Sequence, residues 1–264
     1  VFETTPSVVE TNKNEIVIEF NKDVPKIEFK NVSFSYSNSS KTAVKNLSFK
    51  AYAGDTIGII GGTGSGKSSV INLIPRFYDA TSGKILIDGI DVKDYSFAQL
   101  RGKIGIVPQK AVLFKGTLKE NLLWRKKDAS IEEIQKALKV SQSEEFVKEL
   151  PDKLNFKVQA GGKNLSGGQR QRLTIARAIV GDPEILILDD SASALDFATD
   201  AALRKALKDE INSTVILVSQ RANTVRNANL IIVMENGNIV GMGTHKELME
   251  NCSVYQEIYS SQTK

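Results

Sequence analysis

The sequence has a single cysteine, Cys252, among 264 residues. An internal disulfide is therefore excluded, and one cysteine fits a reducing compartment. No apolar run reaches the roughly 18 residues that a membrane-spanning helix needs. The net charge is only +4, from 35 basic against 31 acidic residues. This small and dispersed excess argues against a nucleic-acid partner.

The chain length suits one large domain or two small lobes, and 41% hydrophobic with 25% charged residues is ordinary for a globular protein. Residues 1–24 are polar and irregular, which predicts a linker or the tail of a preceding domain. The chain starts at Val1, without Met or a signal-peptide pattern, so we expect a segment of a longer protein.

One glycine-rich stretch matches the phosphate-binding pattern G-x-x-x-x-G-K-[ST]. It consists of Gly61, Gly62, Thr63, Gly64, Ser65, Gly66, Lys67 and Ser68, and Ser69 follows as a further candidate ligand. A buried strand is predicted before it, at 56–60, and a helix after it, which is the context that the motif requires. We expect Lys67 to reach the β and γ phosphates and Ser68 to bind Mg²⁺. The alternative is a glycine turn that merely precedes a helix.

The remaining pattern predicts an α/β fold: a P-loop NTPase core with a mostly parallel sheet, an N-terminal antiparallel β-subdomain and an inserted helical lobe. Alternating residues predict antiparallel strands after Pro25, and continuous apolar runs predict central parallel strands. Helical spacing predicts the lobe, at about 112–180, and Ser130 with Glu133 and Thr244 with Glu247 indicate helix starts. The predicted strands are 26–29, 32–36, 47–51, 84–89, 104–107, 184–188 and 214–218; the predicted helices include much of 117–150, 173–179 and 198–207; and a hairpin is expected around 236–237.

Two further stretches carry chemistry. The apolar strand before Asp189 places a carboxylate at its C-terminal end, where ligands of parallel sheets bind and where it can hold Mg²⁺. The pentapeptide Leu165-Ser166-Gly167-Gly168-Gln169 places two glycines and a serine at a helix start, which predicts a second anion site. One nucleotide has little use for two such sites, so the second is expected to serve a neighbouring chain.

The order of the P-loop, Gln109, the pentapeptide at 165–169, Asp189 and the run Ser193-Ala194-Leu195-Asp196 resembles the nucleotide-binding domain of ABC transporters. The resemblance extends from about Pro25 to the end of the chain. The stretches at 113–122 and 243–248 are similar to the exporter branch. Within this resemblance, residues 25–264 form the nucleotide-binding domain and residues 1–24 link it to a transmembrane domain.

The resemblance implies roles for single residues. Tyr36 resembles the aromatic residue that stacks on adenine, although a core tyrosine is the alternative. Gln109 resembles the glutamine that touches Mg²⁺ or its water and faces the membrane domain. Asp196 resembles the aspartate that crosses the dimer interface, and it also fits a helix N-cap. The signature motif, which closes on the γ-phosphate in a partner's P-loop, is formed by Ser166, Gly167, Gly168 and Gln169.

Three positions depart from the family pattern. Asp190 stands where members carry the general-base glutamate, and the missing methylene pulls the carboxylate back by about 1.5 Å. Gln220 stands in place of the switch histidine, and its amide cannot carry an imidazole's proton. His245, the only histidine, lies far downstream. Ala160 replaces a glutamate usual before the exporter signature, which weakens its implied contact with the membrane domain.

The first two departures lie in the site of the chain's own P-loop, whereas the signature is intact. This division resembles the degenerate-site subunit of a bacterial heterodimeric, multidrug-type ABC exporter. It implies an ATPase with weak turnover alone, with ATP and Mg²⁺ as cofactors. A non-identical nucleotide-binding domain and transmembrane domains are the expected partners, at the cytoplasmic face of the cell membrane.

Three alternatives stay open. A chromosome-maintenance ATPase needs coiled-coil heptads that the sequence lacks. A translation or uptake ABC ATPase, and a purely regulatory ATP-binding module, remain as the others.

Overall fold

The computed structural model describes residues 8–12, 14–19, 21–37, 39, 41–191 and 194–262. The chain divides into two compact units. The first unit contains residues 1–104 and 214–264, and the second contains residues 105–213. Among the described residues, no helix combines the length and the apolar character needed to cross a membrane.

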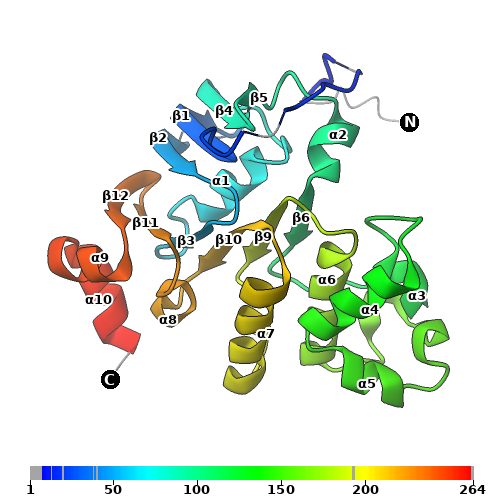
Figure 1. Ribbon diagram of the computed structural model, residues 1–264. Coiled ribbons are helices and arrows are strands. Elements are labelled where there is room, and N and C mark those ends of the chain that lie inside the picture. Colours follow the sequence, from blue (N-terminus) through cyan, green and yellow to red (C-terminus); the bar gives the residue numbers. More distant parts are fainter. Residues whose placement is uncertain are drawn as a thin grey trace. The chain divides into compact units, whose positions relative to one another are not determined.

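The first unit contains two sheets (Figure 1). One is antiparallel, in the order β2-β1-β4-β5, and the other has the order β12-β11-β3-β10 within this unit, with β3 parallel to both of its neighbours. The elements are β1 (Ile27–Ser35), β2 (Thr42–Ala51), β3 (Thr56–Ile60), α1 (Lys67–Leu73), β4 (Ser82–Ile87), β5 (Ile90–Asp91), α2 (Phe97–Gly102), β10 (Thr214–Ser219), α8 (Ala222–Val225), β11 (Leu230–Glu235), β12 (Asn238–Gly243), α9 (His245–Asn251) and α10 (Ser253–Gln262).

Alternation places Phe29 and Phe49 on the buried face of the antiparallel sheet, where their rings stack 4.5 Å apart. Two strand predictions were wrong here. The stretches 26–29 and 32–36 form one strand, β1, because its ladder to β2 continues through a register shift rather than ending. The strand predicted at 47–51 begins at Thr42. Asn38 and Ser40, part of the predicted turn, lie outside the described residues.

Part of the predicted linker, residues 1–24, makes hydrogen bonds within the first unit. The side-chain amide of Gln99, on α2, accepts a hydrogen bond from Ile16 N at 2.9 Å and donates one to Ile16 O at 2.6 Å. Thr11 Oγ1 also donates to Lys93 O at 3.0 Å. These side chains provide hydrogen-bond partners for the backbone N–H and C=O of Ile16 and for the C=O of Lys93.

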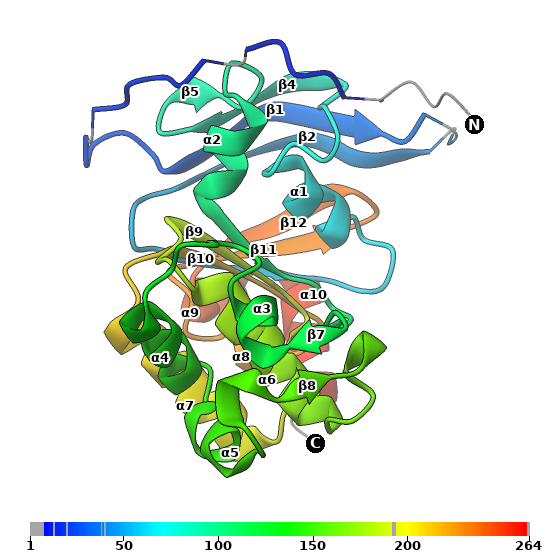
Figure 2. The same ribbon diagram turned by 90° about the vertical axis from the view of Figure 1, so that its right-hand side faces the viewer.

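The second unit contains the helices α3 to α7 (Figure 2). Within it, β9 lies beside β6, and β7 pairs with β8 in a short antiparallel ladder. The elements are β6 (Ile104–Val107), β7 (Gly116–Thr117), α3 (Leu118–Leu122), α4 (Ile131–Val140), α5 (Glu144–Glu149), a 3₁₀ turn (Lys153–Asn155), β8 (Lys157–Val158), a second 3₁₀ turn (Ala160–Gly162), α6 (Gly167–Ile179), β9 (Ile185–Asp189) and α7 (Phe197–Glu210).

The helix starts predicted at Ser130 and Thr244 are confirmed, because both residues form capping boxes, with Glu133 and Glu247. The helical stretch expected over 117–150 was too long, since it is divided into α3, α4 and α5. Helix α6 begins at Gly167 with Ser166 as its N-cap, so the helix start predicted at the pentapeptide 165–169 is confirmed. The α/β fold class itself is confirmed.

A glycine in the P-loop strand sets how closely α8 approaches. A Cβ at Gly58 would lie 2.6 Å from Val225 Cβ on α8, closer than packed atoms allow. Gly58→Ala is therefore expected to destabilise the protein by about 1–3 kcal/mol through overpacking. Urea denaturation measures the change, and Gly102→Ala, which adds its methyl group to open space, is the control. Equal midpoints for the two variants would contradict the prediction.

Candidate functional site

The turn between β3 and α1 has the backbone conformation of a phosphate-binding loop. Gly64 and Gly66 have φ of 78° and 104°, in the region that favours glycine. Gly66 is the N-cap of α1, and a Cβ there would lie 2.6 Å from Ala43 O. The glycines therefore let the loop fold tightly, so that backbone N–H groups and the start of α1 can face an anion.

Lys67 is the charged group of this loop and is 9% exposed. Its ammonium group donates to Gly61 O and Gly62 O, both at 2.7 Å, and to Ser65 Oγ at 3.3 Å. A buried cation needs such partners, because desolvation without them is costly. Lys67 is thus folded along the loop, where it can share its protons with a bound phosphate.

The β11–β12 turn is hydrogen-bonded to the P-loop, a contact that the sequence did not predict. Gly237 N donates to Ser65 O at 3.0 Å, and Gly237 O accepts from Lys45 N at 2.8 Å. The hairpin itself was predicted from Asn236-Gly237 and is confirmed. Its contact with the loop depends on the tertiary position of β11 beside β3, so the sequence carried no local signal for it.

Tyr36 lies beside the P-loop helix. Its hydroxyl group is 3.1 Å from Ser69 Oγ, in the first turn of α1. Its ring packs edge-on against Phe34 and Tyr78, with centroids 4.7 and 5.1 Å away. The residue is half-buried. The structure thus places this aromatic ring beside the first turn of α1, and adenine stacking by Tyr36 stays a prediction.

Gln220 follows β10 directly, and β10 is paired in parallel with the P-loop strand β3. In this register Ser219 lies opposite Ile60, so Gln220 and Gly61 emerge at the same sheet edge. The side chain of Gln220 is exposed. The first unit therefore brings together the P-loop, Tyr36 and the residue in the switch position.

The second unit brings together Gln109 and Asp190. Gln109 follows β6, Asp190 follows β9, and Gln109 Nε2 lies 3.5 Å from Asp190 Oδ2, a long hydrogen bond. Asp190 has φ of 44°, a left-handed conformation that aspartate adopts more readily than most residues. Asp189 ends β9, and its side chain is half-buried. Gln109 and Asp189, the predicted metal ligands, and Asp190, in the general-base position, thus lie at the C-terminal ends of the neighbouring strands β6 and β9.

The signature motif forms a capped helix start. Ser166 Oγ accepts from Gln169 N at 3.2 Å, and Gln169 Oε1 accepts from Ser166 N at 2.9 Å. This capping box leaves the exposed Gly167, with no side chain, at the first position of α6. The sequence reasoning missed the capping box, although the spacing of Ser166 and Gln169 is its signal.

Asp196 is the N-cap of α7, as one interpretation of the sequence predicted. Its carboxylate accepts hydrogen bonds from Thr199 N and Thr199 Oγ1, at 2.9 and 2.8 Å. These bonds stabilise the charged form and lower the pKa of Asp196 below its ordinary value. Ser193, in the same predicted motif, lies outside the described residues.

The residues fit ATP with Mg²⁺. The P-loop offers backbone donors, the Lys67 ammonium group and the exposed hydroxyl group of Ser68. In the described part of the chain, no three His, Cys, Asp or Glu side chains gather as a metal cage. Mg²⁺ commonly needs no such cage, because substrate phosphates, waters and one or two protein oxygens complete its shell. Ser68, Gln109 and Asp189 remain the predicted protein ligands.

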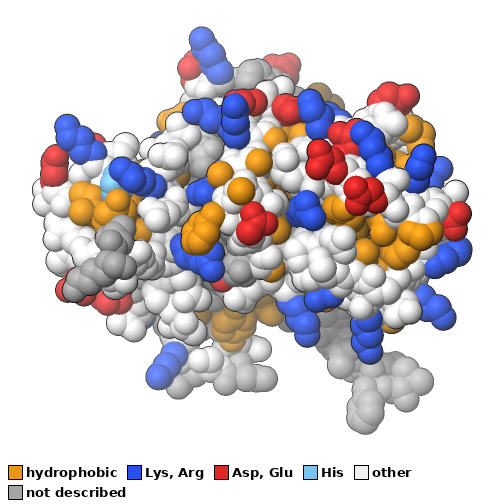
Figure 3. All heavy atoms as spheres, turned by 90° about the horizontal axis from the view of Figure 1, so that it is seen from below, with side chains coloured by type: hydrophobic (Ala, Val, Ile, Leu, Met, Phe, Trp, Pro, Cys, Tyr) orange, Lys and Arg blue, Asp and Glu red, His pale blue; other side chains and the backbone are white. Residues whose placement is uncertain are grey.

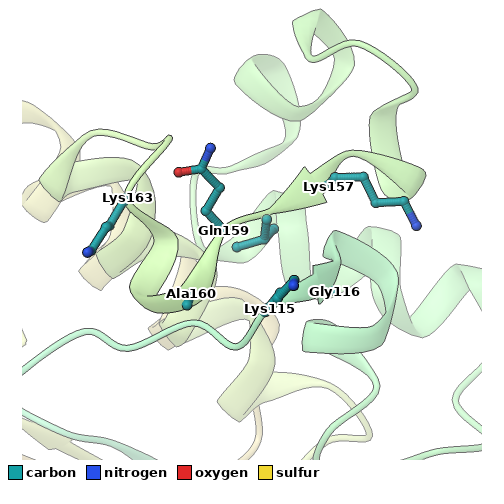
Figure 4. A pocket seen from close by; sticks show the side chains of 7 residues that line it. Lys115, Gly116, Lys157, Gln159, Ala160 and Lys163 are labelled. Atoms are coloured by element: carbon teal, nitrogen blue, oxygen red, sulfur yellow. The ribbon is translucent and has the colours of Figure 1, made fainter.

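A hollow of about 540 Å³ lies on the second unit beside β7 and β8 (Figure 4). Ala160 lies in its wall, at the position where the family resemblance predicts a glutamate. The described lining residues include three lysines and no carboxylate: Lys115, Gly116, Lys157, Val158, Gln159, Ala160 and Lys163.

The face seen in Figure 3 carries both basic and acidic side chains, in keeping with the small net charge.

Comparisons with known proteins agree with this geometry. A family model described as "ABC transporter" matches residues 44–193, more than half of the chain. An uncharacterized ABC transporter ATP-binding protein from Bacillus subtilis is 44% identical over 90% of this chain and 41% of its own length. A Staphylococcus aureus protein named "Putative multidrug export ATP-binding/permease protein" is 42% identical, over 90% of this chain and 41% of that protein.

Among solved structures, a bacterial Atm1-family ABC exporter with ATP bound superposes with a TM-score of 0.90 and 33% identity. The match covers 98% of this chain and 45% of the exporter chain. The chain thus spans about two fifths of the length of the curated relatives it matches. With the P-loop, the signature helix and the sheet order in place, the chain belongs to the ABC transporter family and has the ABC ATPase fold.

Proposed function

We propose that this chain is the ATP-binding domain of an ABC exporter whose own ATP site is degenerate. One observation carries the proposal: the P-loop and signature helix have intact geometry, whereas Asp190 and Gln220 replace the residues that drive turnover. The chain's P-loop holds ATP with Mg²⁺ and hydrolyses it slowly. Its signature motif completes the competent site of a non-identical partner domain.

ATP binding and ATP hydrolysis depend on different residues of the proposed site. Gly66, Lys67 and Ser68 bind the phosphates and the metal, and none of these departs from the motif. Hydrolysis also needs a base within hydrogen-bond reach of the attacking water. Asp190 has the shorter carboxylate, which lies 3.5 Å from Gln109 Nε2, and the Gln220 amide cannot take up a proton near neutral pH as an imidazole does. ATP binding is retained on this account, and the chemical step is impaired.

Export is favoured over uptake or translation by the relatives. The Staphylococcus aureus relative is named for multidrug export and for an ATP-binding/permease protein, and the superposed structure is an exporter. We therefore propose transmembrane domains as partners and the cytoplasmic face of the cell membrane as the location. ATP-driven closure of two ATP-binding domains then powers transport. Nucleic acid is not a proposed partner.

The hollow beside β8 supports a changed contact with such a membrane partner. Ala160 removes a carboxylate, and Lys115, Lys157 and Lys163 leave the hollow basic. An acidic segment of the transmembrane partner suits these ammonium groups better than a basic one.

The test is ATP binding and turnover by the purified chain. We expect tight binding of ATP with Mg²⁺ but turnover well below the roughly 1 s⁻¹ that marks the low end of typical enzymes. Addition of the transporter's second ATP-binding domain should raise turnover. Turnover above that mark by this chain alone would contradict a degenerate site, and no turnover with any partner would favour a purely regulatory module.

A further inference from the structure

The loop that carries Gln220 is held by a residue 42 positions away. The side-chain amide of Gln262, at the end of α10, makes two hydrogen bonds to this loop. Its Nε2 donates to Gln220 O at 2.7 Å, and its Oε1 accepts from Ala222 N at 2.8 Å. One amide thus bridges both sides of the loop, which we call the switch loop (residues 220–221).

These bonds supply a cap that α8 lacks in its own sequence. Arg221 is the N-cap of α8 and makes no side-chain capping bond. The N–H groups of a first helical turn have no partner within the helix. Gln262 satisfies Ala222 N from another helix, and so fixes the direction in which the chain enters α8.

The other side of α8 is also fixed. Val225 packs directly on Gly58 of the P-loop strand. The guanidinium group of Arg226 lies 6.0 Å from the ring centre of Tyr259 on α10, a second contact between these segments. Helix α8 thus contacts β3 and α10, which lies beside it in Figure 1. In the switch loop, the side chains of Gln220 and Arg221 are both exposed.

We infer that Gln262 is a positioning residue for ATP binding: it holds the switch loop so that the Gln220 side chain faces the γ-phosphate. The inference rests on the proposed binding of ATP at this P-loop, where the Gln220 amide donates a hydrogen bond to the γ-phosphate. It is supported by the register that sets Gln220 beside the P-loop strand, because Gln262 holds the Gln220 carbonyl group itself. A loop freed from Gln262 keeps its sequence but loses the pre-set direction of that side chain.

The first measurement is hydrogen exchange of the Ala222 amide in the complete chain. Gln262→Ala removes its acceptor, and we expect exchange at least about tenfold faster. Gln262→Glu retains an acceptor and should keep the amide protected. Gln256→Ala is the matched control, because Gln256 lies on the same helix and its amide donates to Met249 O at 2.7 Å, away from the switch loop. It should leave Ala222 unchanged.

The second measurement is the ratio of ATP to ADP affinity, with Mg²⁺, by calorimetry. Only ATP has a γ-phosphate, so a general loss of structure weakens both ligands, whereas a misdirected Gln220 weakens ATP alone. Gln220→Ala is expected to lower the ratio about tenfold, the effect of one hydrogen bond to a charged group. Gln262→Ala is expected to lower it several-fold, and Gln256→Ala to leave it unchanged.

The outcomes separate the two claims. Faster Ala222 exchange together with a lower ratio in Gln262→Ala supports the inference. If Gln220→Ala lowers the ratio and Gln262→Ala does not, the positioning role is overturned while the role of Gln220 stands. If Gln220→Ala leaves the ratio unchanged, the proposed role of Gln220 fails and the inference falls with it. An effect of Gln256→Ala equal to that of Gln262→Ala also overturns it.

Discussion

Replacing Asp190 with glutamate and Gln220 with histidine is expected to raise ATP turnover on the order of a hundredfold, because a catalytic group misplaced by about 1 Å costs about that much. The added methylene extends the carboxylate by about 1.5 Å toward the attacking water. The imidazole restores a group that can donate and accept a proton near neutral pH. Neither residue belongs to the P-loop, and histidine can also donate a hydrogen bond to the γ-phosphate, so ATP affinity should stay close to that of the parent chain.

The left-handed backbone at Asp190 is expected to lower the stability of this variant. Asp190 has φ of 44°, and glutamate tolerates this left-handed conformation less well than aspartate. We therefore expect a stability loss of about 1 kcal/mol, within the 1–2 kcal/mol range for a left-handed residue. Urea denaturation should accompany each rate measurement.

Turnover is measured at rising chain concentration, because we propose that the signature motif of one chain completes the site of another. The double variant should show turnover that rises more steeply than in proportion to concentration. Asp190→Asn is the matched control, since it keeps the shape and the left-handed tolerance but removes the carboxylate. A double variant no faster than the parent chain, at equal stability and with dimers detected by light scattering, would refute the carboxylate-reach argument.

Lys67→Ala is expected to weaken ATP binding on the order of a hundredfold, since hydrogen bonds to charged groups contribute about 1.5–3 kcal/mol. The substitution removes the one side-chain cation of the P-loop motif, whose Nζ lies 2.7 Å from Gly61 O and from Gly62 O. Both carbonyl oxygens then lose this donor, so a loss of stability of about 1–3 kcal/mol accompanies the change.

Comparison of ATP with adenosine separates these two effects. Adenosine has no phosphate, so its affinity should change little in Lys67→Ala if the loop keeps its shape. Lys84→Ala, at an exposed position of β4, is the control for the loss of one positive charge. Equal weakening of ATP and adenosine would indicate a collapsed loop rather than a lost phosphate contact.

The motifs that act through adjacent residues could be predicted from the sequence. The glycines at 64 and 66 adopt positive φ, and the helix begins at Lys67, because the P-loop conformation depends on residues within one short turn. The capping boxes at Ser130 and Thr244 form for the same reason, since their partners lie three residues away. The family resemblance rests on such local segments.

Strand limits were predicted less well. Thr42 to Asn46 joins β2 because β1 lies beside it, and residue pattern alone did not show this partner. The division of the region 117–150 into three helices was also missed, because its apolar spacing continues across turns. In both cases the missing information is which segment supplies the hydrogen-bond partners or the packing surface.

The sequence by itself determined that this chain has a P-loop, a signature helix and two departures from the family pattern, Asp190 and Gln220. Only the tertiary structure decided what holds these parts. The Gly237 turn braces Ser65, and Gln262 bridges the switch loop from 42 residues away. Such contacts join segments that are distant in the chain, and their hydrogen bonds depend on how the sheets and helices pack, which no local pattern encodes.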